Sequence, residues 1–208
     1  EPEKLAAVHR SMGRASVAAG PARFAADPDV TTVIAAMCAR KNFLATNVGR
    51  IVSTVTARDA AATRTMVKLL LAQTRPGAHE AALWAAIRVA GPELLSTLTS
   101  FASSVTPTRT RLAALAYAAS AASGDRPSIG RLVSLVRNDD LPRSYAYDLA
   151  KELRVSGSKI AFKVYLQLLL DEQYAFAAAQ AFGRISGFDR RVGWRDVKEQ
   201  RQKLHEEF

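Results

Sequence analysis

Apolar residues recur along much of this chain at intervals of three and four, the spacing that places them on one face of an α-helix. The pattern is clearest in segments that begin near residues 30, 94 and 129, each just after a proline. Between them lie alanine-rich stretches that are apolar on more of their surface, such as 111–122 and 145–153. Amphipathic helices that alternate with more uniformly apolar ones predict an all-α protein.

Glycine ends the alanine-rich stretches at a nearly constant interval. From Gly91 to Gly124 and from Gly124 to Gly157 the spacing is 33 residues, and Gly187 follows after another 30. A fixed period in this range is the sequence signature of stacked structural repeats. Each period contains two helical stretches separated by a short break, so the repeating unit is expected to be a helix pair.

The fold class predicted here is therefore an all-α solenoid of about six antiparallel helix pairs, forming a single domain over residues 1–208. Breaks are expected where a cap residue meets a proline, as at 75–77, 106–108 and 139–142. The expected pairs cover residues 3–41, 43–75, 78–105, 109–139, 143–172 and 173–205. The segments 1–27 and 190–208 depart from the repeat and are expected to be atypical capping helices, because a terminal repeat needs a polar outer face.

A first helix that ends at a glycine break, followed by an amphipathic leucine-rich helix, resembles the HEAT-like, armadillo-type family of helical repeats. The resemblance covers residues 78–187. It implies a curved two-layer superhelix whose concave layer grips another macromolecule, and it implies no chemistry.

Charge adds information about the partner. The sequence has 29 Lys and Arg against 19 Asp and Glu, a formal net charge of +10. Between residues 28 and 138, thirteen basic residues stand against five acidic ones. Such an excess favours acidic partners, whether proteins, nucleic acids or anionic membranes.

Several basic residues recur at helical spacing on the second helices of the expected pairs. If these helices line the concave layer, the cations form a discontinuous positive track; otherwise they are the solvated faces that any amphipathic helix has. The candidate binding surface consists of Arg64, Lys68, Arg75, Arg131, Lys159, Lys163, Arg191, Trp194, Arg195 and Lys198.

Motifs for catalysis, cofactor binding and metal binding were sought and not found. The three histidines stand in separate repeats, and the glycines follow helices rather than strands, so neither a zinc motif nor a phosphate-binding loop is indicated. Paired carboxylates at 139–140 and 171–172 fall between helices, where they are expected to cap the next helix. No catalytic residue, metal site or cofactor is therefore predicted.

The expected function is that of a non-enzymatic binding scaffold or adaptor that holds an acidic protein or peptide along a basic inner surface. The alternative is sequence-independent binding of nucleic acid through its phosphates. Weaker still is contact of the C-terminal helix with anionic lipid, which interspersed glutamates oppose. No apolar run approaches the roughly 20 residues of a membrane span, and a cytoplasmic location is expected.

Overall fold

The computed structural model describes residues 60–74, 76–106, 110–186 and 198–207. Every regular element in these ranges is helical and none is a strand, so the prediction of an all-α protein is confirmed. The helix pair expected at 3–41 and the capping segment expected at 1–27 lie outside the described residues.

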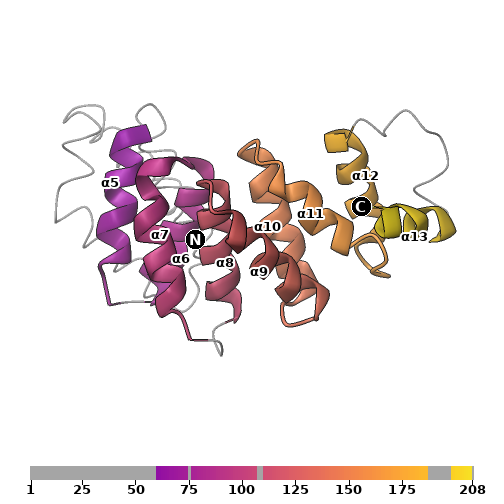
Figure 1. The fold of residues 1–208 in the computed structure, drawn as a ribbon, viewed down its shortest axis with the longest axis horizontal. Coiled ribbons are helices and arrows are strands. Elements are labelled where there is room, and N and C mark those ends of the chain that lie inside the picture. The colour runs from indigo at the N-terminus through magenta and orange to yellow at the C-terminus, as the bar shows by residue number, and fades with distance from the viewer. Residues whose placement is uncertain (1–59, 75, 107–109, 187–197, 208) are drawn as a thin grey trace, which may run out of the picture. The chain divides into compact units, whose positions relative to one another are not determined.

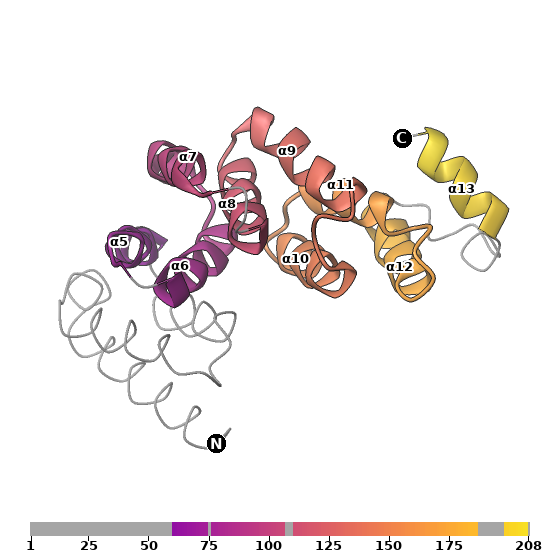
Figure 2. The ribbon, with the colours of Figure 1, turned by 90° about the horizontal axis from the view of Figure 1, so that it is seen from below.

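The chain packs as two compact units, Glu1–Ser104 and Val105–Phe208. The continuous single domain over residues 1–208 stays a prediction. Figures 1 and 2 show the ribbon from two directions, and the helix labels below follow them.

The first unit contains, among its described residues, three α-helices and one short 3₁₀ turn. They are α5 (Ala60–Leu71), α6 (Pro76–Arg88), η1 (Pro92–Leu94) and α7 (Leu95–Ser104). The apolar stripe of α5, including Met66, Val67 and Leu70, is buried, and α5 packs on both α6 and η1. Pro76 opens α6, as expected for a residue that tolerates the first helical turn but not the interior.

The second unit contains six described helices. They are α8 (Thr110–Ala122), α9 (Arg126–Arg137), α10 (Arg143–Val155), α11 (Ile160–Gln167), α12 (Ala175–Ser186) and α13 (Lys198–Glu207). Successive helices α8 and α9 pack on each other, and so do α10 and α11. In addition α8 contacts α10 and α9 contacts α11, so two rows of helices run side by side within this unit (Figure 2).

The alanine-rich helices are buried to different degrees. In α6 and α8 most side chains are buried, from Ala81 to Ile87 and from Leu112 to Ala116, as the uniformly apolar pattern predicted. The third such stretch differs, because α10 exposes Asp148 and Lys151 while it buries its other face. Small side chains on α6 and α8 allow neighbouring helices to approach closely, which explains why alanine dominates there.

Helix ends in the second unit coincide with the predicted breaks. The side chain of Asp125 accepts a hydrogen bond of 3.1 Å from the backbone N–H of Ser128 and so caps the first turn of α9. Asp171 does the same before α12, accepting from the N–H groups of Gln173 and Tyr174. The paired carboxylates therefore contribute a cap, as the sequence indicated.

Within the described ranges, no helix combines the length and the apolar character that crossing a membrane would require.

Candidate binding surface

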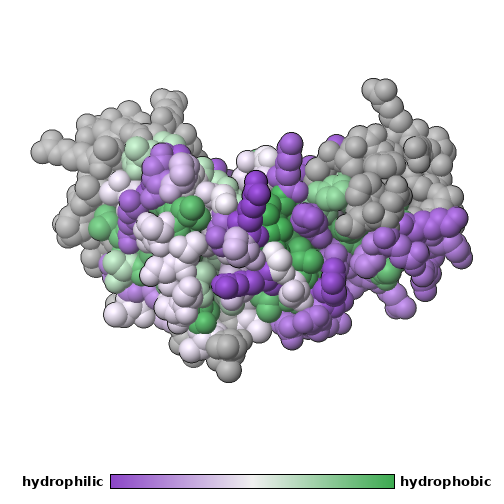
Figure 3. All heavy atoms as spheres, in the orientation of Figure 1, coloured by the Kyte–Doolittle hydropathy of each residue, from purple (hydrophilic) through white to green (hydrophobic). Residues whose placement is uncertain are grey.

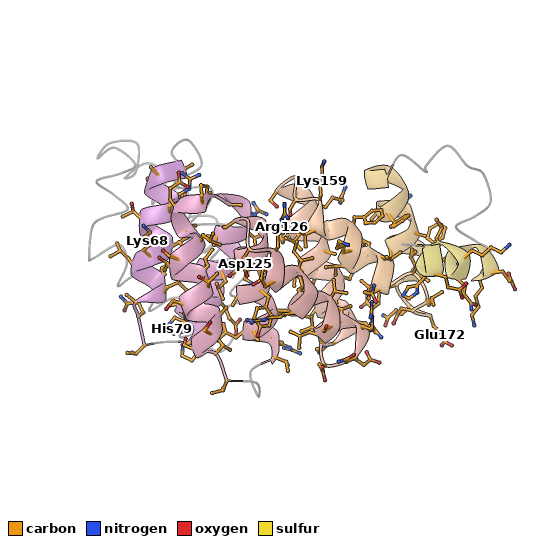
Figure 4. All side chains as sticks on the ribbon, in the orientation of Figure 1. Lys68, His79, Asp125, Arg126, Lys159 and Glu172 are labelled. Atoms are coloured by element: carbon orange, nitrogen blue, oxygen red, sulfur yellow. The ribbon has the colours of Figure 1, made fainter. Side chains whose placement is uncertain are left out.

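The candidate cations divide between those already engaged with other side chains and those that project into solvent. Of the ten predicted surface residues, Arg75, Arg191, Trp194 and Arg195 lie outside the described residues. Figures 3 and 4 show the surface and the side chains of the remainder.

Two candidates lie in the first unit, on α5, and they differ. Lys68 is exposed (Figure 4). Arg64 is half-buried, with 23% of its side chain exposed, and its guanidinium lies 3.3 Å from the Glu93 carboxylate of η1. Gly91 makes room for this pair, because a Cβ atom there would lie 2.7 Å from the Arg64 guanidinium. Arg64 therefore ties α5 to η1, and Lys68 is the freer of the two cations.

Arg131 projects from α9 in the second unit. Its side chain is exposed, and its guanidinium carbon lies 5.7 Å from the centre of the Tyr117 ring on α8. Such a contact orients the guanidinium over the face of the ring without neutralising its charge. A cation held in this way remains available to a carboxylate.

Lys159 and Lys163 lie at the beginning of α11. Lys159 directly precedes the helix, Lys163 follows one turn later, and both are exposed. Lys198, the first residue of α13, is exposed too. No described carboxylate forms an ion pair with any of these three lysines.

The sequence analysis did not include two exposed cations next to this group. Arg126 is the first residue of α9, and Arg154 lies near the end of α10. The signal that could have identified Arg126 is the repeat itself, because Lys159 stands 33 residues further along the chain, at the equivalent turn.

Other arginines in the second unit serve the packing of the helices. Arg143 donates a hydrogen bond of 2.8 Å to the Val136 carbonyl oxygen, and its Nε lies 2.9 Å from Asp139 and 3.6 Å from Asp171. It thereby connects the end of α9, the start of α10 and the turn before α12. Arg143 is a structural residue rather than a free cation.

Aromatic side chains in the described residues belong mostly to the core. Trp84, Tyr165 and Phe182 are buried, which confirms their prediction as core residues. Phe176 was expected in the core as well, and this expectation is wrong, because 57% of it is exposed on the first turn of α12. The apolar pattern places Phe176 on a helix but cannot show whether a neighbouring element covers that face.

The tyrosines pack against one another. Tyr147 meets Tyr165 edge to face, with ring centres 6.0 Å apart, and stacks on Tyr174 at 5.3 Å. Burial raises the pKa of Tyr165 above its ordinary value of 10.0, and this rise is partly opposed by the positive charge of Arg154. These rings contribute to packing and do not form an open stacking platform for bases.

The described residues bring together no group of three His, Cys, Asp or Glu side chains suited to a metal ion. His79 makes local contacts on α6: its Nε2 pairs with the Gln73 carbonyl oxygen, and its ring meets Phe101 edge to face at 5.0 Å.

Comparisons with protein families, with curated protein sequences and with solved structures found no match to this chain.

Proposed function

We propose that this protein is a non-enzymatic scaffold, an α-solenoid of HEAT-like helix pairs that binds an acidic protein or peptide. Two features of the second unit support the repeat. Its helices pack as successive pairs, α8 with α9 and α10 with α11, and each helix also contacts its counterpart in the next pair. The alternation of helix direction along this unit in Figure 1 is the pattern expected of antiparallel pairs.

The glycine period supplies the second line of support. Gly124 and Gly157 both follow the first helix of a pair and both adopt positive φ, at 112° and 76°. Gly91 differs, because its φ of −175° is extended and it precedes the 3₁₀ turn η1. The strict 33-residue repeat therefore has support between α8 and α11.

The observation that carries the binding proposal is the exposure of cations that no described carboxylate pairs with. Lys68, Arg131, Lys159 and Lys163 all belong to this group. Solvent-exposed cations attract acidic partners and accelerate encounter with them, while their desolvation on binding is modest. Binding without catalysis rests on the sequence, which carries none of the catalytic or cofactor motifs sought in it.

Affinity capture from cell extract, with and without nuclease, tests this function. We expect acidic proteins to remain bound after nuclease treatment. The variant Lys68→Glu/Arg131→Glu/Lys163→Glu should lose them. The matched control is Arg111→Glu/Arg137→Glu/Lys203→Glu, which changes the net charge equally at other exposed positions and should retain them.

Recovery of partners only without nuclease would transfer the function to nucleic acid. Equal loss from both triple variants would mean that overall charge, rather than this set of residues, attracts the partner.

A further inference from the structure

The turns of the second unit are polarised by charge. Figure 1 shows the turns after α8 and after α10 on the upper side of this unit, and the turns after α9 and after α11 on the lower side. Figure 4 labels Arg126 and Lys159 on the upper side and Glu172 on the lower. The upper turns are basic, while the lower turns contain the paired carboxylates at 139–140 and 171–172.

Four exposed cations define what is called here the basic edge: Arg126, Arg154, Lys159 and Lys163. The segments 123–128 and 153–163, which carry them, contain one acidic residue, Asp125. Its carboxylate is occupied by the backbone N–H and the hydroxyl of Ser128. The positive charge of this edge is therefore not cancelled by its own turns.

An exposed apolar residue lies within the same edge. Val155, the last residue of α10, is 58% exposed and follows directly after Arg154. A large aliphatic side chain in solvent beside several cations offers a partner both apolar contact and charge. A peptide supplies both kinds of group, whereas a phosphate backbone supplies charge alone.

The repeat sets the spacing of the charges. Arg126 and Lys159 occupy equivalent positions at the start of α9 and α11, which contact each other. Packed helices have axes about 8–10 Å apart, so equivalent residues on them are separated by a similar distance. A polyproline II segment has three residues per turn and rises about 3.1 Å per residue, so every third side chain recurs on one face after about 9 Å.

We infer that the basic edge binds an extended acidic peptide whose carboxylates recur at every third residue. Arg126 and Lys159 each hold one carboxylate, Arg154 and Lys163 extend the positive field on either side, and Val155 contacts an apolar side chain between them. This inference rests on the proposed function, which it narrows to one surface and one kind of peptide.

Fluorescence anisotropy of the full chain at low ionic strength tests it with two labelled peptides of equal composition. One repeats the triplet Glu-Pro-Pro; the other has the same residues with all glutamates adjacent. We expect the triplet peptide to bind at least about fivefold more tightly, because only its carboxylates match the spacing of the cations.

Paired variants locate the contact. Arg126→Glu/Lys159→Glu should weaken binding of the triplet peptide at least about tenfold. Both substitutions place an acidic residue at a helix N-terminus, where it is favourable, so the variant should keep its fold. The control Arg111→Glu/Arg137→Glu makes the same charge change at other exposed positions and should stay within about twofold of the wild type.

The alternative outcomes overturn the inference in distinguishable ways. Equal weakening by both double variants excludes the basic edge but leaves a scaffold that attracts acidic partners by charge. Equal binding of the two peptides excludes the spacing, and no binding of either excludes the peptide. Tighter binding of a labelled single-stranded DNA of about twelve nucleotides than of both peptides excludes this class of partner. The proposed function itself fails only if the capture experiment fails.

Discussion

Gly124 and Gly157 occupy the same position in two helix C-terminal caps that are 33 residues apart in the chain. After α8, the N–H of Asp125 donates to the Ser120 carbonyl oxygen at 3.0 Å; after α10, the N–H of Ser158 donates to that of Leu153 at 2.9 Å. Each glycine lies just before the donor, with positive φ. This is the Schellman arrangement, and its recurrence gives the sequence period a structural cause.

Replacement of either glycine by alanine should destabilise the protein through the backbone alone, because no atom lies within 4 Å of an added Cβ. We expect a loss of about 1–2 kcal/mol for Gly124→Ala, and less for Gly157→Ala, whose φ of 76° is closer to the left-handed minimum. Urea unfolding measures both. Gly130→Ala, in an exposed position inside α9, is the control and should stabilise by about 0.5–1 kcal/mol.

Asp139 takes the glycine position in the cap of α9. Its φ is 62°, and the N–H of Asp140 donates to the Leu135 carbonyl oxygen at 3.1 Å. Substitution by Gly or by Ala removes the ion pair with Arg143 equally, so the difference between the two variants measures backbone strain. Asp139→Gly should be about 1 kcal/mol more stable than Asp139→Ala by urea unfolding. Equal stability of the two would show that this cap carries no strain.

Arg143 should be the most sensitive surface arginine of the second unit. Its removal breaks the hydrogen bond to Val136 and the ion pairs with Asp139 and Asp171 together. Because Arg143 is partly exposed, we expect a loss of about 1–2 kcal/mol for Arg143→Ala, seen as a lower Tm. Arg137→Ala, which removes a longer contact of 3.4 Å to Gln167, should change stability by less than about 0.5 kcal/mol. A similar effect of both substitutions would contradict the connecting role of Arg143.

Tyr165 predicts how stability responds to alkaline pH. Burial, partly opposed by Arg154, raises the pKa of its phenol above 10.0 in the folded protein, so the unfolded chain loses this proton first. The contribution is complete below pH 10 and declines as pH rises through the folded pKa. We expect Tyr165→Phe to lose stability less steeply than the wild type between about pH 9 and 11 in urea unfolding. Tyr117→Phe controls for the removal of one phenol, and equal slopes for both variants would refute the prediction.

The helices and their breaks followed from the sequence because they depend on neighbours in the chain. The three-and-four spacing located α9 and α11, proline located the start of α6, and the glycine period located two C-terminal caps. These signals act within a few residues, through backbone hydrogen bonds and the conformations that proline and glycine permit.

The sequence by itself determined that this chain is helical, where several helices end, and that its surface carries excess positive charge. Only the tertiary structure decided which cations are engaged and which are open to a partner. Arg64 pairs with Glu93, 29 residues away, and Phe176 emerges on the surface although its pattern suits a core. Pairing and burial depend on elements distant in the chain, and their positions are set by packing rather than by local spacing.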